Sequence, residues 1–274
     1  MDDDAARCGA RAASRTATSA DALVADLEDA AAVLGSPTRH ARTDAAGMLE
    51  CEAIVLCPRA PFTNSATCDV RMAGLTANAP LIGRFGRHLA GYRGTVVVVT
   101  NPVDVLTRLF AEASGCARVY GVGAETDTAR YRITLARAHG VPVEAVTGGQ
   151  VIGEHGEAAV ARWAAVGGRV LAHDPDLVRA ALADRPRVIA RGLGRVRCGP
   201  AAAVVSALRA AFGLTDATVV LSTRRPDGTY SGRPVRFTGG IPHPVDLDLT
   251  PAERAQLAAA ERKITAAHAI VHRS

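Results

Sequence analysis

The stretch "TVVVVT", residues 95–100, is rich in β-branched residues and stops at Asn101-Pro102. Because it does not alternate between apolar and polar side chains, it is typical of a strand buried on both faces. Two shorter runs have the same character, "AIVLCP" at 53–58 and "RVYGVG" at 118–123. Helical patterns separate these runs, so the sequence predicts a parallel sheet covered by helices on both faces.

Helices are expected on either side of these strands. Residues 21–34 carry apolar side chains at helical spacing and stop at Gly35, and another helix is expected around 75–90. A third covers 127–139 and is closed by Gly140. The alternation of strand and helix indicates an α/β fold for this part of the chain.

The second half of the chain has a different pattern. Helices are expected over 176–191 and 201–212, and residues 217–239 are typical of two strands joined at the turn Asp227-Gly228. The last helix opens on a capping box, "TPAE" at 250–253. We therefore expect the parallel α/β part to give way to a mixed α+β part.

The charge and composition exclude several classes of partner. The 274 residues carry a net charge of +5, but Lys263 is the only lysine and the arginines are spread along the chain. With 4% aromatic residues and no basic run, nucleic-acid binding is not expected. No run of 18 apolar residues indicates a membrane span, and the acidic, polar start is no secretory signal.

The cysteine pattern predicts a reducing compartment. None of the six cysteines forms a C-x-x-C pair, which favours free thiols in the cytoplasm over a disulfide framework or a zinc site. We accordingly expect a cytoplasmic protein without a bound metal. The six are Cys8, Cys51, Cys57, Cys68, Cys116 and Cys198.

"VIGEHGEAAV", residues 151–160, is the first candidate for chemistry. A histidine that works as an acid or base needs a carboxylate to fix its tautomer, and Asp127 is available to His155. Arg130 follows three residues later on the same helix face, and a guanidinium binds a carboxylate substrate through two parallel hydrogen bonds. The alternative is an ordinary surface ion pair between Asp127 and Arg130.

Three motifs in this order resemble the L-lactate/malate dehydrogenase family: "TNPVDVLTRL" at 100–109, "GAETDTARYR" at 123–132 and "VIGEHGEAAV". The resemblance covers nearly the whole chain. It includes "ADLEDA" at 25–30, "RMAGLTAN" at 71–78, "DGTYSG" at 227–232 and "LTPAERAQL" at 249–257. It implies a Rossmann-type parallel sheet in residues 1–106, incomplete because its first βα unit is missing, and an α+β substrate and catalytic domain in 107–274.

The resemblance also implies roles for individual residues. His155 is expected to be the catalytic acid/base, Asp127 its carboxylate partner and Arg130 the residue that holds the substrate carboxylate. Arg71 is expected to polarise the reacting carbonyl from a mobile loop. Asn101, with Thr100 before it, is expected at the nicotinamide and the substrate oxygen. The implied substrate is a small 2-oxo or 2-hydroxy acid, the cofactor NAD or NADP, and the assembly a homo-dimer or homo-tetramer.

The choice between lactate and malate is left open by the sequence. Glu154 is closer to the lactate branch, while Glu157 departs from the family's usual aspartate. The loop between Arg59 and Arg71 is several residues longer than is usual. A dicarboxylate is plausible if Arg59 reaches the pocket, and an uncharged substrate side chain if smaller residues line it instead. The smaller candidates are Ala60, Asn64 and Ser65.

A regulatory site found in some bacterial relatives is not expected. Those relatives carry a histidine seven residues before the catalytic one, where this chain has Gly148, although Arg132 matches another part of that site.

The beginning of the chain departs most from the family. A dinucleotide fold opens on a strand followed by G-x-G-x-x-G at a helix N-terminus, and this sequence has no such element. Where NAD-specific members carry an acidic residue, the chain has Ser14-Arg15-Thr16, which suits a 2′-phosphate or a weaker preference for NAD. The alternative for Arg15 is a solvated loop residue. Two explanations stay open: a recorded start that is too late, or a shortened, degenerate paralogue that cannot hold the cofactor and acts as a non-catalytic subunit.

Overall fold

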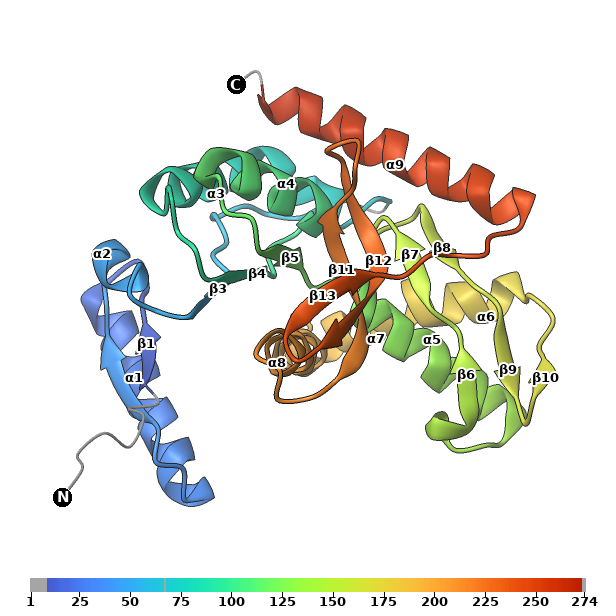
Figure 1. Ribbon diagram of the computed structural model, residues 1–274, viewed down its shortest axis with the longest axis horizontal. Coiled ribbons are helices and arrows are strands. Elements are labelled where there is room, and N and C mark those ends of the chain that lie inside the picture. The colour runs from blue at the N-terminus through green and yellow to red at the C-terminus, as the bar shows by residue number, and fades with distance from the viewer. Residues whose placement is uncertain (1–8, 67, 273–274) are drawn as a thin grey trace. The chain divides into compact units, whose positions relative to one another are not determined.

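The computed structural model describes residues 9–66 and 68–272, so Cys8 lies outside the described residues (Figure 1). The chain divides into two compact units, Met1–Glu52 and Ala53–Ser274. The predicted boundary after residue 106 separates the expected dinucleotide-binding part from the expected catalytic part. It falls inside helix α4 (Val103–Ser114) and stays a prediction.

The first unit contains a β–α–β arrangement. Strands β1 (Gly9–Ala12) and β2 (Arg39–Arg42) are parallel, with α1 (Ala17–Leu34) between them and the short α2 (Ala45–Met48) after them. Helix α1 ends at Gly35 as predicted but begins four residues before the predicted start. The reason is Thr16, whose hydroxyl oxygen accepts a hydrogen bond from the Ser19 amide at 3.1 Å and caps the helix.

The second unit is built on one mixed sheet. The three predicted parallel strands are confirmed as β3 (Ala53–Leu56), β4 (Thr95–Val98) and β5 (Val119–Gly121). Beyond β5 the sheet continues antiparallel through the predicted hairpin of β11 (Ala217–Arg224) and β12 (Tyr230–Thr238), with β13 (Ile241–Pro244) on β12. Strands β7 (Val151–Gly153) and β8 (Ala159–Ala161) complete it. A smaller sheet contains β6 (Val146–Gly148), β9 (Ala164–Val166) and β10 (Arg169–Val170).

Helices cover both faces of the main sheet, as predicted. Figure 1 shows α3 (Leu75–His88) and α4 on one side of β3, β4 and β5, and α8 (Cys198–Ala211) on the other. Helix α5 (Ala124–His139) follows β5 directly. Among the described residues, no helix has the length and apolar character that a membrane span requires.

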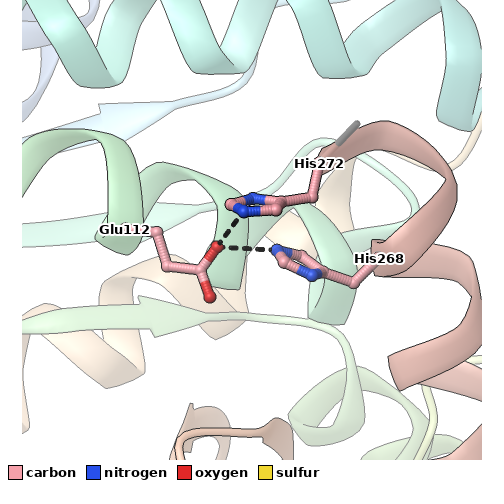
Figure 2. A group of neighbouring side chains, drawn as sticks. All are labelled: Glu112, His268 and His272. Atoms are coloured by element: carbon pink, nitrogen blue, oxygen red, sulfur yellow. Dashed lines mark hydrogen bonds and ion pairs between the residues drawn. The ribbon is translucent and has the colours of Figure 1, made fainter. Parts of the chain in front are cut away.

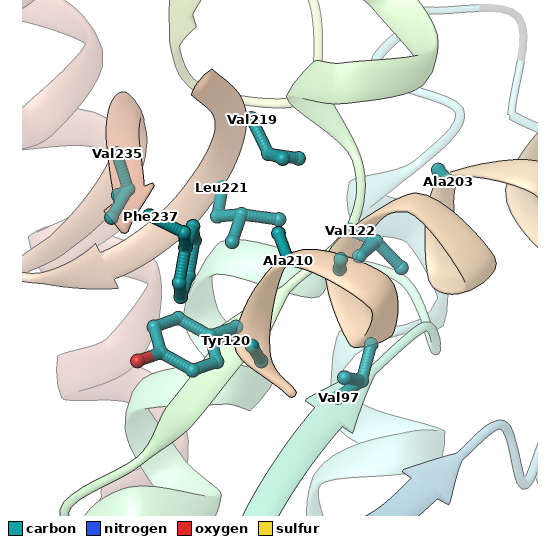
Figure 3. Close-up of a cluster of buried hydrophobic side chains, with 11 residues drawn as sticks. Val97, Tyr120, Val122, Ala203, Ala210, Val219, Leu221, Val235 and Phe237 are labelled. Atoms are coloured by element: carbon teal, nitrogen blue, oxygen red, sulfur yellow. The ribbon is translucent and has the colours of Figure 1, made fainter. Parts of the chain in front are cut away.

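Helix α8 packs closely on the sheet because its inner face consists of alanines. Ala203, Ala207 and Ala210 lie against strands β4, β5, β11 and β12 in a buried cluster (Figure 3). In that cluster the rings of Tyr120 and Phe237 meet edge to face at 5.8 Å, a favourable aromatic geometry. This packing fixes β5, and with it the start of α5.

The helix predicted over 176–191 is one helical segment with a wider middle. Helix α6 (Pro175–Arg179) and α7 (Arg185–Leu193) are joined by the π-helical turn Ala180–Asp184. The predicted helix is therefore present, with a wider turn in its middle that the sequence pattern did not indicate. Pro186 explains the difference, because it has no amide proton and its ring clashes with the carbonyl four residues earlier.

The last helix, α9 (Pro251–His272), begins as predicted. The Thr250 amide donates to Glu253 Oε2 at 2.8 Å, and the Glu253 amide donates to Thr250 Oγ1 at 3.2 Å. This reciprocal pair is the expected capping box. The helix then packs against α3, α4, β7, β8 and β12, so it contacts elements from both the parallel and the antiparallel parts of the unit.

Candidate active site

A single buried carboxylate holds the candidate site together. Asp127 lies in the first turn of α5, and its side chain is 0% exposed. Its Oδ2 lies 2.6 Å from His155 Nδ1, and its Oδ1 accepts hydrogen bonds from Arg130 Nη1 at 2.8 Å and Arg71 Nη2 at 3.4 Å. Because Arg130 is also buried, the alternative of an ordinary surface ion pair is excluded.

A glycine lets the imidazole reach this carboxylate. Gly123 separates β5 from α5, and a Cβ built on it would lie 2.4 Å from His155 Cγ. Real Cβ atoms do not approach a ring so closely, so only glycine leaves room for His155 at this position. The glycine of "GAETD" therefore belongs to the site as much as the aspartate does.

A second buried aspartate positions the histidine backbone. The His155 amide donates to Asp104 Oδ2 at 2.7 Å, and Asp104 lies in the first turn of α4. Burial raises the pKa of Asp104 to about 7, against the opposing effect of this hydrogen bond. Sequence reasoning missed Asp104, although the residue stands in the "NPVD" motif that it did single out.

Burial and charge set the protonation of the central pair. Although burial opposes it, the charges of His155, Arg71 and Arg130 lower the pKa of Asp127 to about 2. Burial, and then the two arginines, lower the pKa of His155 below 6.5 despite the opposing effect of Asp127. At neutral pH the imidazole is therefore neutral, with Nδ1–H donating to Asp127. Nε2 is then the nitrogen that can take up a proton.

Arg71 lies at the end of a loop that is held by contacts of Asp69. The Asp69 amide donates to Glu157 Oε1 at 2.6 Å. Lys263 on α9 bridges the loop to the histidine segment, with its Nζ 2.8 Å from Asp69 Oδ1 and 2.9 Å from Glu154 Oε1. Glu154 and Glu157, on either side of His155, thus connect the loop carrying Arg71 to the segment between β7 and β8 that carries the imidazole.

Comparison of the sequence with known proteins relates the chain to a family. A malate dehydrogenase from Halobacterium salinarum is 32% identical over 207 residues, which are 69% of this chain and 67% of that protein. An L-lactate dehydrogenase from Lactobacillus delbrueckii subsp. bulgaricus is 32% identical over 195 residues, 65% of this chain and 63% of that protein. The chain belongs to the lactate/malate dehydrogenase family.

The extent of the match differs among relatives. An L-lactate dehydrogenase from Treponema denticola is 39% identical, but over only 99 residues, 35% of this chain and 31% of that protein. The chain thus spans between 31% and 67% of the length of these three relatives. No family model matches the chain.

Solved structures show the same fold. The malate dehydrogenase of Cryptosporidium parvum superposes with a TM-score of 0.81 at 20% identity, covering 92% of this chain and 87% of that one. The minor L-lactate dehydrogenase of Enterococcus mundtii gives a TM-score of 0.82 at 22% identity, covering 94% and 88%. The predicted fold class is therefore confirmed.

Asn101 and Thr100 follow β4, at the carboxyl end of the parallel strands. The Asn101 carbonyl accepts a hydrogen bond from Asn78 Nδ2 at 2.9 Å. Within the described part of the chain, the side-chain Oδ1 of Asn101 is buried without a partner, which leaves it available to a ligand. The Thr100 hydroxyl donates to the Pro58 carbonyl at 2.6 Å, so it is already used within the protein.

Of the remaining predicted residues, Arg59 and Asn64 of the second unit make contacts outside the Asp127 cluster. Ser14 and Arg15 are exposed residues between β1 and α1 of the first unit, and their contact with a cofactor stays a prediction. Arg59 is exposed, and its guanidinium lies over the Phe62 ring at 4.3 Å from the ring centre. Asn64 Nδ2 donates to the Val70 carbonyl at 2.9 Å, which is a contact within the loop.

The residues of the regulatory site known from some relatives are used locally. Arg132 Nε donates to the Gly148 carbonyl at 2.8 Å. A Cβ on Gly148 would lie 2.6 Å from the Trp163 carbonyl oxygen, so a larger residue at 148 does not fit this backbone. That the regulatory site is absent stays a prediction.

Replacing Lys263 with Met should loosen the loop that carries Arg71. The substitution keeps the length of the stem but leaves Asp69 and the buried Glu154 without their cation. We expect a several-fold higher KM for a substrate that contacts Arg71, and faster proteolysis within residues 57–71. Steady-state kinetics and limited proteolysis measure the two effects.

The control is Lys263→Arg, which keeps a positive charge at the same place and should restore both values. If Lys263→Met behaves as the parent in both measurements, the bridge does not position Arg71.

Proposed function

We propose that the protein interconverts a 2-oxo acid and its L-2-hydroxy acid with a nicotinamide cofactor. The observation that supports this most strongly is the buried Asp127, which contacts His155, Arg130 and Arg71 together. An oriented imidazole beside two guanidinium groups suits a substrate that carries a carboxylate and an oxygen that gains or loses a proton.

His155 is the proposed acid/base. In oxidation its neutral Nε2 takes the proton of the substrate hydroxyl, and Asp127 stabilises the imidazolium that forms. In reduction the imidazolium returns that proton to the new hydroxyl oxygen. Asp104 accepts the hydrogen bond of the His155 amide and keeps the backbone of His155 in place in both directions of the reaction.

The two arginines act on opposite ends of the substrate. Arg130 offers a rigid fork of donors to the substrate carboxylate, which would replace part of its present bond to Asp127. Arg71 faces the oxygen on which negative charge develops, and it is less buried than Arg130 because it comes from the loop. A substrate with no carboxylate would leave Arg130 with Asp127 alone.

The residues present fit the nicotinamide end of the cofactor. Asn101 Oδ1 and the Thr126 hydroxyl are both buried and have no hydrogen-bond partner among the described residues, so they are suited to hydrogen bonds with a polar ligand. When bound, the cofactor supplies the hydride transfer. Ser14 and Arg15, in the first unit, are proposed to contact a ribose hydroxyl or 2′-phosphate, so NADP is tested beside NAD. A lactate dehydrogenase of Cryptosporidium parvum with this fold is known with lactic acid and nicotinamide adenine dinucleotide bound.

Pyruvate and L-lactate are the proposed substrate pair. Glu154 favours the lactate branch, and Arg59 is engaged with Phe62, so we assign it no contact with a second substrate carboxylate. Malate and oxaloacetate are the alternative pair. The variant Arg59→Gln separates them: it should leave pyruvate reduction within about threefold of the parent, whereas a selector arginine would lose oxaloacetate reduction by about 10²-fold or more.

The test of the function is a two-by-two assay of the chain. Pyruvate and oxaloacetate are each combined with NADH and NADPH, and cofactor binding is measured separately by calorimetry. Reduction of either acid supports the proposed activity, and the ratio of kcat/KM values assigns the substrate and the cofactor. Absence of both turnover and dinucleotide binding contradicts it and favours the alternative of a non-catalytic subunit.

We also propose a homo-dimer or homo-tetramer in the cytoplasm. Helix α1 buries Ala20 but leaves Leu23, Val33 and Leu34 exposed, which suits a face covered by another subunit. Free thiols in the described part of the chain include Cys57, Cys68, Cys116 and Cys198, which supports the predicted reducing compartment.

A further inference from the structure

Two helices bring three metal-ligating side chains together outside the Asp127 cluster. Glu112 lies on α4, while His268 and His272 lie one turn apart on α9 (Figure 2). His268 Nε2 is 2.7 Å and His272 Nδ1 is 3.7 Å from Glu112 Oε2. One ligand atom from each residue lies within 4.8 Å of the others.

The spacing of these atoms is near that of a coordinated ion. Metal–ligand bonds of about 2.0–2.2 Å place neighbouring tetrahedral ligands roughly 3.4 Å apart. The carboxylate and His268 would need to separate slightly and His272 to move closer. The latter is easy because the His272 side chain is 65% exposed, whereas that of His268 is 6% exposed and stays fixed by packing.

The orientation of the carboxylate suits a cation. Glu112 Oε1 accepts a hydrogen bond from Arg108 Nε at 2.8 Å, which orients the carboxylate and leaves Oε2 toward the histidines. The guanidinium charge opposes cation binding, so moderate affinity is expected.

We propose that Glu112, His268 and His272 bind a divalent transition-metal ion such as Zn²⁺, Co²⁺ or Ni²⁺. Two imidazoles and one carboxylate select these ions over Mg²⁺ and Ca²⁺, which prefer all-oxygen sites. Three protein ligands leave the exposed side of the ion to water. The site shares no residue with the proposed catalytic cluster, so it does not depend on the proposed function.

The expected consequence is a link between α4 and the end of α9. A ligand that binds only the folded state raises its stability in proportion to the logarithm of its free concentration. Sequence reasoning missed the site because it searched for cysteine pairs. The histidine pair "HAIVH", 268–272, has helical i,i+4 spacing, but its third ligand comes from residue 112 in a distant part of the chain.

The experiment is a Co²⁺ and Zn²⁺ titration of the full chain after EDTA treatment, with thiols blocked by iodoacetamide. Calorimetry and the visible Co²⁺ spectrum give the stoichiometry and the ligand type, and thermal unfolding gives the shift in Tm. We expect one equivalent bound, without a thiolate band, and a Tm that rises with Zn²⁺ concentration. The variants His272→Ala and Glu112→Gln should weaken binding at least about tenfold and remove the shift.

The matched control is His243→Ala, which removes an exposed imidazole from β13 and should bind as the parent does. His272 is exposed, so its replacement should not disturb the fold. The proposal fails if the parent binds no equivalent at submillimolar metal, if His272→Ala and Glu112→Gln both bind as tightly as the parent, or if His243→Ala loses binding to the same extent.

Discussion

Asparagine in place of His155 is expected to lower kcat/KM for 2-oxo acid reduction by about 10²- to 10⁴-fold, the usual contribution of a positioned acid/base. An asparagine amide keeps a donor toward Asp127 Oδ2, so the buried carboxylate stays satisfied and the fold is preserved. Initial rates and thermal unfolding, measured together, separate loss of chemistry from loss of structure. A variant as active as the parent would remove His155 from the proposed mechanism.

The matched control is His139→Asn at the exposed end of α5, the helix that also carries Asp127. It should change neither rate nor stability.

The pH profile gives a second reading of the same residue. Because the folded pKa of His155 lies below 6.5, reduction, which needs the imidazolium, should decline as pH rises through that lowered value. Oxidation needs the neutral imidazole and should be retained above it. For the parent, kcat/KM for reduction should fall with rising pH while kcat/KM for oxidation rises. The residual activity of the asparagine variant should show neither change.

Replacing Asp127 with Asn should cost both activity and stability. The carboxylate is fully buried, and its replacement by an amide leaves the buried Arg130 and the partly buried Arg71 without the negative charge that offsets theirs. Breaking such a buried pair costs about 3–5 kcal/mol of unfolding free energy. Activity should fall by at least about 10²-fold, since the imidazole loses the group that fixes its tautomer. Urea unfolding and initial rates are the measurements.

The decrease of the unfolding free energy at acidic pH tests the same carboxylate. The folded pKa of Asp127 is about 2 and the ordinary value is 3.8, so the lowered pKa contributes stability that is present above 3.8 and lost as pH falls toward 2. Asp127→Asn should lack this part of the pH dependence. If the variant loses stability at acidic pH as the parent does, Asp127 is not the carboxylate responsible.

The chain offers a close control for this substitution. Asp176 and Arg179 form another i,i+3 pair at 3.1 Å, but both side chains are exposed, Asp176 by 84%. Asp176→Asn should change the unfolding free energy by no more than about 0.5 kcal/mol, since exposed pairs contribute little. Comparable losses in both variants would show that burial of Asp127 is not the cause.

Local patterns were enough to predict most of the fold. The non-alternating run of β4, the glycine that ends α1 and the capping box of α9 each act within a few residues, so their signals are complete in the sequence. The π-helical turn before Pro186 was not predicted, because a proline near a helix start and one inside a helix look alike until the preceding turn is seen.

The site was predictable only as far as the family motifs carry it. His155, Asp127, Arg130 and Arg71 stand in motifs, and the structure brings them together. Asp104 and Lys263 were missed because each acts on a partner far away in the sequence, 51 residues for Asp104 and His155 and 109 for Lys263 and Glu154. Spacing says nothing about such pairs, which only the folded chain creates.

The bridge from α9 to the Arg71 loop contains the sole lysine of the sequence, Lys263. An acylating reagent that attacks primary amines therefore has one side-chain target in this protein. Its carboxylate partners raise the pKa of that amine although burial opposes them, so acylation should be slow while the bridge is made. The acylation rate, measured by mass spectrometry of the intact protein, would then report how often the bridge opens. A substrate that holds the Arg71 loop closed would slow the acylation of the amine.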